Sequence, residues 1–283
     1  MKMQTFKVER QESLVTFIKA NIFGAGYAFC KSVLKNKDVK INGVRTGNDT
    51  MLRKGETVQI YYPDDAIKSY MPYKIVYDDP NIIVVFKNQG IEVTSPHNKN
   101  TLEQLVGFKA AHRLDVNTEG LVVFSKNEKA AEELRAAFEE GFIEKNYLAL
   151  CLGTLNNSPL TLTGYLTKDS GSGIVEITKE KKEGSNASQV KTIVSFVKNV
   201  GDLSLLKIKA VTGRTHQIRA HLASIKLYIV GDGKYGNTKM NKIYGYDKQC
   251  LTATELIFSF PSSFMLSYLN KKKLEVSPSF LKK

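Results

Sequence analysis

Asp115 lies in a turn of polar and small residues, 111–120, that opens directly into the apolar run 121–124. A short apolar run bounded by turn residues indicates a buried strand, so a strand holds this turn at its edge. A rigid element thus presents one potential nucleophile or general base, as a catalytic site requires. Because an Asp in a loop is also a common turn former, this stretch alone leaves a structural and a catalytic interpretation open.

Two later segments favour the catalytic interpretation. Residues 145–150 read Lys-Asn-Tyr-Leu-Ala-Leu, and residues 213–222 read Gly-Arg-Thr-His-Gln-Ile-Arg-Ala-His-Leu. Together with His-Arg-Leu-Asp at 112–115, followed by Thr118 and Gly120-Leu121, they resemble the motifs of the RluA-type family of RNA pseudouridine synthases. Ile229-Val230-Gly231-Asp232 and Tyr235-Gly236 extend the resemblance, which spans about 72–262.

The resemblance implies an α+β fold with a mixed, largely antiparallel central sheet and flanking helices for residues 66–283. Residue patterns predict strands and helices that fit it. The expected strands are 73–77, 82–87, 121–125, 142–152 and 203–211. The expected helices are a short one after the capping box Thr101–Gln104, one at 127–140 ended by Gly141, and one at 215–224. Gly171-Ser172-Gly173 predicts a hairpin turn, and the basic tail 271–283 is expected to be partly mobile.

Isomerising uridine to pseudouridine breaks a carbon–nitrogen glycosidic bond and forms a carbon–carbon bond to the same ribose. The resemblance assigns Asp115 the role of nucleophile or charge stabiliser. It also implies that Arg219 pairs with this carboxylate, which needs a partner to stay charged in a water-poor pocket. By the same resemblance Tyr147 lines the uracil pocket, where it stacks on the base and moves the proton from carbon 5.

No cofactor is expected, because the reaction involves no redox change or group transfer. The sequence contains neither a dinucleotide-binding glycine motif followed by an acidic residue nor a P-loop. A metal-dependent nuclease built from Asp115, Asp232, His216 and His221 is disfavoured by the ligand spacing, and no metal is expected.

RNA is the expected partner. The chain has 41 Lys and Arg against 28 Asp and Glu, a net charge of +13, which is typical of a phosphate-binding surface but also of a merely Lys-rich one. The target base must leave its helix, and Arg113 is placed to fill the gap. Lys145, Arg214 and His216 are predicted RNA contacts; a helix at 215–224 puts His216 and Arg219 on one face. His112 and His221 are expected to be structural.

Residues 1–65 are predicted to form a separate small α+β module. Helical spacing at 14–18, a helix at 27–35, an Asn42-Gly43 hairpin and a strand at 57–62 resemble the RNA-binding module of ribosomal small-subunit protein four. The module's predicted phosphate contacts are Lys31, Lys35, Lys37, Lys40 and Arg45. The chain departs from that pattern with Lys37 where Gly is common and Tyr27-Ala28 where Ser-Arg is common.

The catalytic part also departs from its family at three places. Glu119 stands where Ser is common and is expected to add negative charge beside Asp115, Asn88-Gln89 replaces Pro-Ala, and Tyr228 replaces Pro. None of these changes removes a proposed catalytic group.

The three cysteines are scattered, no targeting segment is evident at the start, and no apolar run is long enough to cross a membrane. We therefore expect a cytoplasmic, monomeric protein that does not bind membranes. Two functional alternatives to a synthase acting on large-subunit ribosomal RNA stay open. One is a synthase acting on transfer RNA, and the other is a non-catalytic RNA-binding or ribosome-assembly factor on the same fold.

Overall fold

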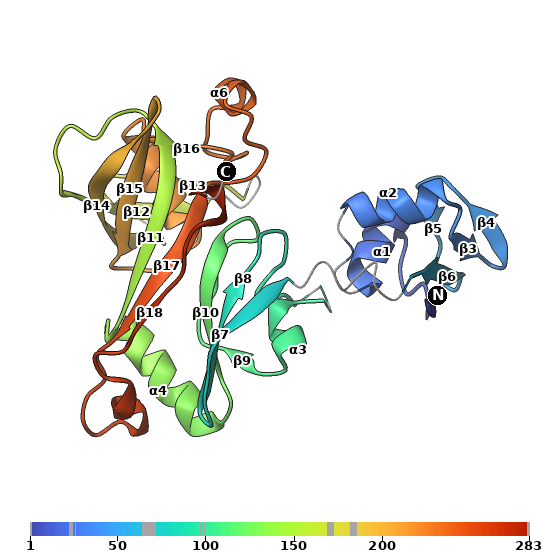
Figure 1. Ribbon diagram of the computed structural model, residues 1–283, viewed down its shortest axis with the longest axis horizontal. Coiled ribbons are helices and arrows are strands. Elements are labelled where there is room, and N and C mark those ends of the chain that lie inside the picture. The colour runs from blue at the N-terminus through green and yellow to red at the C-terminus, as the bar shows by residue number, and fades with distance from the viewer. Residues whose placement is uncertain are drawn as a thin grey trace. The chain divides into compact units, whose positions relative to one another are not determined.

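The structure, a computed structural model, describes residues 2–22, 25, 27–63, 72–96, 98, 100–168, 173–181 and 186–281. The chain forms two compact units (Figure 1): the first comprises residues 1–74 and 90–107, and the second comprises 75–89 and 108–283. The domain boundary predicted after residue 65 falls outside the described residues and stays a prediction. Within the described ranges, no helix is long and apolar enough to cross a bilayer.

The first unit combines helices with a four-stranded sheet. The sheet order is β1-β6-β3-β4, and β2 pairs separately with β5. A tight hairpin joins β3 to β4, because Asn42 and Gly43 both adopt positive φ (49° and 86°), as the Asn-Gly pair predicts. The elements are β1 (Lys2–Lys7), β2 (Glu12–Ser13), α1 (Leu14–Asn21), α2 (Tyr27–Lys35), β3 (Val39–Ile41), β4 (Val44–Thr46), β5 (Met51–Leu52) and β6 (Thr57–Tyr62).

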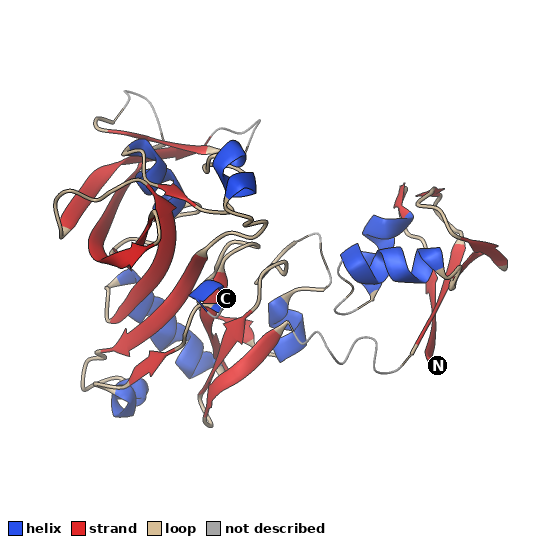
Figure 2. Cartoon of the chain, turned by 45° about the horizontal axis from the view of Figure 1, so that its top comes forward, coloured by secondary structure: helices blue, strands red, loops and turns tan. Residues whose placement is uncertain are grey.

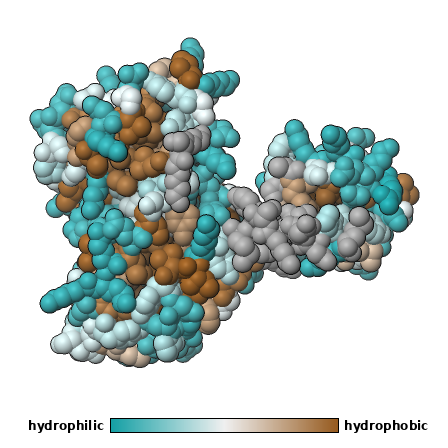
Figure 3. Space-filling view, viewed as in Figure 1, coloured by the Kyte–Doolittle hydropathy of each residue, from teal (hydrophilic) through white to brown (hydrophobic). Residues whose placement is uncertain are grey.

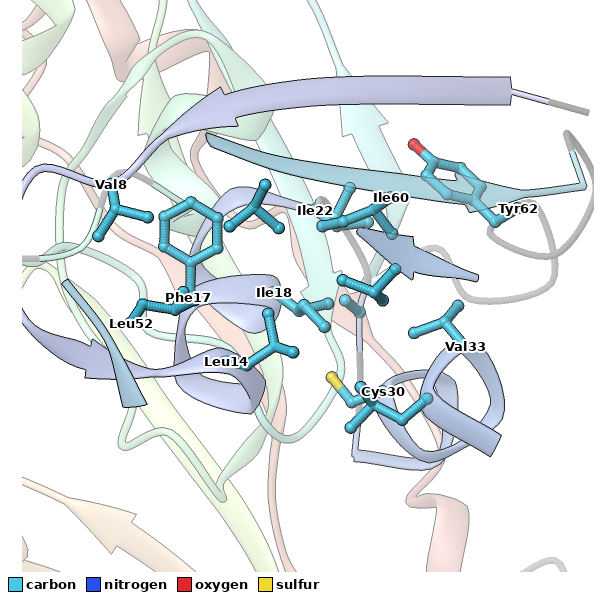
Figure 4. Close-up of a cluster of buried hydrophobic side chains, with 14 residues drawn as sticks. Val8, Leu14, Phe17, Ile18, Ile22, Cys30, Val33, Leu52, Ile60 and Tyr62 are labelled. Carbon is cyan, nitrogen blue, oxygen red and sulfur yellow. The ribbon is translucent and has the colours of Figure 1, made fainter. Parts of the chain in front are cut away.

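The core of this unit lies between the helices and the sheet (Figure 4). Leu14 and Ile18 of α1, Cys30 of α2 and Ile60 of β6 are all fully buried in one cluster. Alternate β6 residues are buried, as expected for a strand with one face on a core. A separate helix of the same unit, α3 (Leu102–Val106), has the capping box predicted from Thr101 and Gln104.

The second unit is built on one large sheet, with helices beside it (Figure 2). Its strand order is β13-β12-β14-β15-β11-β17-β10-β8-β7, and β16, β18 and β9 pair at the side of this path. All pairings in it are antiparallel except that of β10 with β17, so the predicted fold class is confirmed. The strands are β7 (Tyr73–Asp78), β8 (Ile82–Lys87), β9 (Lys109–Ala110), β10 (Glu119–Ser125), β11 (Ile143–Leu152), β12 (Leu160–Lys168), β13 (Val175–Thr178), β14 (Ser188–Val200), β15 (Leu203–Ala210), β16 (Tyr228–Ile229), β17 (Leu251–Phe258) and β18 (Lys273–Glu275).

The described residues of the second unit form three α-helices: α4 (Glu128–Glu139), α5 (Gln217–Ser224) and α6 (Thr238–Ile243). The Asn127 side chain caps α4, and Leu134 packs in a buried cluster that also holds Leu121 of β10. This packing fixes β10, and with it the turn that carries Asp115. Two short 3₁₀ helices follow at Met265–Leu269 and Ser279–Leu281.

Gly120 allows β10 and β17 to approach each other. Its φ is +128°, and a Cβ built on it would lie 2.3 Å from the carbonyl oxygen of Ala253. No other residue fits both this backbone conformation and this spacing. The parallel contact of β10 with β17 therefore depends on a glycine directly after the Asp115 turn.

One expectation from the sequence needs correction. The helix predicted at 215–224 begins only at Gln217, because His216 is in the left-handed region with φ of +55°. The described part of the tail packs on the second unit, where β18 pairs with β17 and Phe280 is buried in a core cluster, and its partial mobility stays a prediction. Residues 171–172 of the predicted hairpin turn lie outside the described residues.

Candidate active site

Asp115 sits between β9 and β10, in a turn that is held at several points. The Thr118 amide donates to the Asp115 carbonyl (3.0 Å), and Leu114 is buried with 7% of its surface exposed. From β8, Lys87 Nζ donates to the Val116 carbonyl (3.0 Å). The side chain of Asp115 keeps 21% of its surface exposed. The backbone is thus anchored while the carboxylate stays accessible.

Arg219 of α5 contacts two carboxylates. Its Nη1 donates to Asp115 Oδ2 (2.8 Å), while Nε and Nη2 donate to Asp232 Oδ2 and Oδ1 (2.7 and 2.9 Å). Burial opposes the charge on the guanidinium, but the bonds to Asp232 and Asp115 outweigh it and raise the pKa of Arg219. A permanent cation therefore faces Asp115.

Asp232 holds Arg219 in place. Its side chain is completely buried and also accepts hydrogen bonds from the amides of Lys234 and Tyr235 (2.8 and 3.0 Å). Burial alone would raise the pKa of Asp232, yet these bonds and the Arg219 charge lower it. An ionised, fully bonded Asp232 explains why Arg219 keeps one fixed orientation, with Nη1 left for Asp115.

His216 also lies beside Asp115, although it does not reach this place as part of a helix at 215–224, as the sequence predicts. It precedes α5 instead of sharing a helical face with Arg219. Its Nε2 is 3.9 Å from Asp115 Oδ2, and its Nδ1 is 3.1 Å from the Tyr235 hydroxyl. Burial lowers the pKa of His216, and the Asp115 charge only partly opposes this. A strained backbone at such a place is a common feature of functional sites.

Tyr147 projects from β11 and is 8% exposed. Burial, and secondly the Asp115 charge, raise the pKa of its phenol, so it stays protonated at neutral pH. Its hydroxyl makes no hydrogen bond with the part of the chain that the structure describes. The pairing of β11 with β17 shifts register between Asn146 and Tyr147, a bulge of the kind that re-aims side chains near active sites.

The predicted RNA contacts of this unit differ in exposure. Arg113 and Arg214 are exposed, whereas Lys145 is half-buried, with Nζ 5.1 Å from the Phe138 ring centroid. Burial lowers the pKa of Lys145. The two arginines are therefore free to meet phosphates, and Lys145 packs mainly against its own protein.

Glu119 is buried beside the sheet and does not present its charge at the surface. Its side chain is buried, with 4% exposed, and accepts hydrogen bonds from the Thr252 hydroxyl (2.7 Å) and from the Ser279 amide and hydroxyl (2.8 and 2.7 Å). It therefore links β10 to β17 and to the tail. Its charge does not face an approaching RNA.

His112 and His221 are structural, as expected. The Val123 amide donates to His112 Nε2 (3.2 Å), and burial lowers the pKa of His112 to about 3. His221 Nδ1 is 2.8 Å from the Thr192 hydroxyl, and burial lowers its pKa to about 4. In the described part of the chain, no three His, Cys, Asp or Glu side chains gather in a way that fits a metal ion.

The segment that contains Asp115, Tyr147 and Arg219 matches a known family. Residues 81–224 match RNA pseudouridylate synthases. A relative in Mycoplasma genitalium, an uncharacterized RNA pseudouridine synthase, is 34% identical over 225 residues, covering 72% of this chain and 68% of the relative. The chain belongs to the RNA pseudouridylate synthase family.

Two further comparisons fit this membership. The structure of human RNA pseudouridylate synthase domain containing 1 is 26% identical, covers 73% of this chain and 89% of its own, and has a TM-score of 0.56. The mitochondrial tRNA pseudouridine(32) synthase of Saccharomyces cerevisiae is 28% identical, over 75% of this chain and 48% of the yeast protein. The protein is an RNA pseudouridine synthase, which confirms the predicted enzyme class.

Two residues of this synthase's site were missed by sequence reasoning. Lys87 has no exposed surface, and burial lowers its pKa to about 7 although Asp115 and Glu119 oppose this shift. Gln249, which is 3% exposed, donates from Nε2 to Asp232 Oδ2 (3.0 Å). Lys87 ends a predicted strand and precedes the Asn88-Gln89 departure, which is a weak signal. No motif marks Gln249.

The first unit presents the remaining predicted RNA contacts. Lys31, Lys35, Lys37 and Arg45 are exposed, and Lys40 is half-exposed. Lys40 Nζ and Arg45 Cζ lie 5.3 and 5.9 Å from the Tyr61 ring centroid. The pair of cations around one aromatic ring gives this unit a local basic patch.

Proposed function

We propose that Asp115, Arg219 and Tyr147 carry out the conversion of uridine to pseudouridine at specific sites in a large structured RNA, with large-subunit ribosomal RNA favoured over transfer RNA. The observation that carries the catalytic part is the ion pair of Arg219 with Asp115, 2.8 Å long and anchored by the buried Asp232. This arrangement places a permanent cation beside one partly exposed carboxylate and fixes the orientation of that carboxylate, which is what the reaction needs.

The ionised carboxylate serves each of the three routes that are conceivable for this isomerisation. It can attack ribose carbon 1, attack the base, or remove a proton from the ribose during elimination. In all of them the bond from nitrogen 1 to the ribose breaks, the base rotates, and carbon 5 forms the new bond. Carbon 5 loses its proton and nitrogen 1 gains one, so atoms balance without a cofactor. Arg219 keeps a positive charge and a hydrogen-bond donor at the Asp115 carboxylate before and after the reaction.

Tyr147 is proposed to stack on the target base and to relay the carbon 5 proton: its hydroxyl oxygen takes up that proton as it gives its own proton toward nitrogen 1. Its ring is held on β11, and its protonated hydroxyl has no other hydrogen bond among the described residues, so a substrate group can take that place. Arg113 and Arg214, both exposed, are proposed to contact the RNA backbone around the displaced nucleotide.

The first unit is proposed to be an RNA-binding module like that of ribosomal small-subunit protein four. Its two helices, its sheet and the basic residues Lys31, Lys35, Lys40 and Arg45 support this. An accessory basic module suits a large folded RNA, which offers many phosphates, and it is the reason for favouring ribosomal RNA. The yeast relative favours transfer RNA instead. We also propose that the protein acts in the cytoplasm as a monomer.

The test is a map of pseudouridines in total RNA from cells that lack the gene, complemented with wild type or Asp115→Ala. We expect one or a few sites in large-subunit ribosomal RNA to disappear and to return only with wild type. Sites in transfer RNA would replace the proposed substrate and leave the chemistry intact. If Asp115→Ala restores every site, Asp115 is not catalytic; if no site changes, the binding-factor alternative gains support.

A further inference from the structure

Behind the Asp115–Arg219 pair lies a buried hydrogen-bond bridge. The Thr118 hydroxyl donates to Gln249 Oε1 (3.0 Å), and Gln249 Nε2 donates to Asp232 Oδ2 (3.0 Å). All three side chains are buried, with 3%, 3% and 1% of their surfaces exposed. Polar groups buried to this extent are costly unless their bonds are satisfied, so the bridge constrains each member.

The bridge closes a ring through Asp115. From Asp232, one arm runs through Arg219 to the Asp115 carboxylate (2.7 and 2.8 Å). The other arm runs through Gln249 and Thr118, whose amide donates to the Asp115 carbonyl (3.0 Å). Asp115 is thereby held at its side chain by one arm and at its backbone by the other.

An amide side chain in the place of Gln249 keeps the ring closed at every pH. It must accept a hydrogen bond from the Thr118 hydroxyl and donate one to a carboxylate that is permanently charged. An ionised Glu has no proton to donate, and an apolar side chain leaves both Thr118 and Asp232 short of a partner.

The backbone is built to bring Gln249 to Asp232. A Cβ on Gly231 would lie 1.9 Å from the carbonyl oxygen of Lys248, so the chain before Asp232 and the chain before Gln249 touch. The Cys250 amide donates to the Val230 carbonyl (2.8 Å) and fixes the same junction. The path of the main chain therefore brings Asp232 and Gln249 together.

We propose that Gln249, together with Thr118, is a positioning residue that sets the orientation of Asp115 for pseudouridine formation. The proposal rests on the proposed catalytic role of Asp115. Neither residue touches the reacting atoms; both act through Asp232 and through the turn. Gln249 contacts the charged Asp232, which Arg219 shares, while Asp115 and Lys87 bond the turn that carries Thr118.

The first test replaces Gln249 by its isosteric acid. In Gln249→Glu the introduced carboxyl is buried against Asp232, so it is protonated at lower pH, where it can donate to Asp232 as the amide does. At higher pH it ionises and repels Asp232. We expect the ratio of the variant's kcat to that of wild type to fall about tenfold between pH 6 and pH 9.

A second pair of variants tests the Thr118 end of the bridge. Thr118→Val has nearly the same shape but no hydroxyl, and we expect its kcat to fall about tenfold with KM within about twofold of wild type. Thr118→Ser keeps the hydroxyl and is expected to stay within about twofold in both parameters. If Thr118 served packing alone, Thr118→Val would not be slower than Thr118→Ser.

All proteins are assayed on total RNA from cells lacking the gene, with thermal unfolding measured in parallel. The control Gln189→Glu adds the same charge at an exposed site on β14. The ratio of its kcat to that of wild type is expected to be independent of pH. The proposal is overturned if the kcat of Gln249→Glu relative to wild type does not change with pH, or if Thr118→Val has the kcat of wild type. Inactive wild type, or active Asp115→Asn, would instead mean that the proposed function has failed.

Discussion

Arg219 bonds Asp232 through two nitrogens (2.7 and 2.9 Å) and Asp115 through one (2.8 Å). The two carboxylates differ in access, since Asp232 is fully buried and Asp115 is 21% exposed. The fork of the guanidinium thus separates two tasks that one carboxylate cannot combine: Asp232 holds the cation, and Asp115 remains available to react.

Arg219→Lys tests this division. A lysine carries the charge but cannot make three hydrogen bonds in the plane of the fork. We expect kcat to fall at least about a hundredfold, because Asp115 loses its fixed partner. The free energy of unfolding should fall by about 2 kcal/mol, because the buried Asp232 is left partly unpaired. The control Arg135→Lys, at an exposed site on α4, should match wild type in both measurements.

Tyr147→Phe separates stacking from proton transfer. The hydroxyl has no hydrogen-bond partner within the described ranges, so its removal should leave the melting temperature almost unchanged. We expect KM to stay near wild type, because the ring remains, and kcat to fall about a hundredfold, because the proton carrier is gone. Unchanged kcat would show that Tyr147 acts through its ring alone. Tyr147→Leu should raise KM as well.

Gly120→Ala should damage the catalytic unit through its backbone. The added Cβ would lie 2.3 Å from the Ala253 carbonyl oxygen, and β10 would have to move away from β17. We expect a loss of about 3 kcal/mol in the free energy of unfolding, measured by urea denaturation. Gly141→Ala is the matched control: φ is also positive there (+79°), but nothing lies within 4 Å, and about 1 kcal/mol is expected.

The local elements were predictable from the sequence because local patterns determine them. The helix at Tyr27–Lys35 and the strands at Thr57–Tyr62 and Ile82–Lys87 have the bounds expected from periodicity and turn residues. The Asn127 cap and the Asn42-Gly43 hairpin follow from the preferences of single residues. Asp115 and Arg219 were found through motifs, although 104 residues separate them.

The features that could not be predicted from the sequence depend on contacts between residues that are far apart in the chain. The buried position of Glu119 could not be predicted from its neighbours, because the hydroxyl groups that donate to its carboxylate, those of Thr252 and Ser279, lie 133 and 160 positions further along the chain. Gln249 has no motif, and its role follows only from Thr118 and Asp232 together. The left-handed backbone of His216 delays the start of the helix that its neighbours suggest, because tertiary contacts with Tyr235 override propensity.

Lys87→Met should change how stability depends on pH. Burial lowers the pKa of Lys87 to about 7 in the folded protein. From there up to about pH 10 the unfolded chain binds a proton that the folded chain does not, so this group makes the free energy of unfolding rise with pH, by about 1.4 kcal/mol per unit. Below about pH 7 both states bind the proton and the contribution is constant.

Lys87→Met lacks this titrating group, so its free energy of unfolding does not have this rise with pH. We expect urea denaturation at pH 7, 8 and 9 to show that the free energy of unfolding of wild type increases relative to that of Lys87→Met at each step. The variant also loses the bonds to Asn88 and Val116, but this changes the difference by the same amount at every pH. The exposed control Lys198→Met should keep a constant offset from wild type. A constant offset for Lys87→Met would mean that Lys87 stays charged inside the fold.

The bond from Thr118 to Gln249 joins residues 131 positions apart in the sequence. A chain that emerges from the ribosome therefore presents Asp115 long before it contains the partner that completes the ring. Until Gln249 has met both Thr118 and Asp232, the second arm of the ring is open and only Arg219 holds the carboxylate. The arrangement proposed for catalysis is thus completed late in folding, after both ends of this long span have come together.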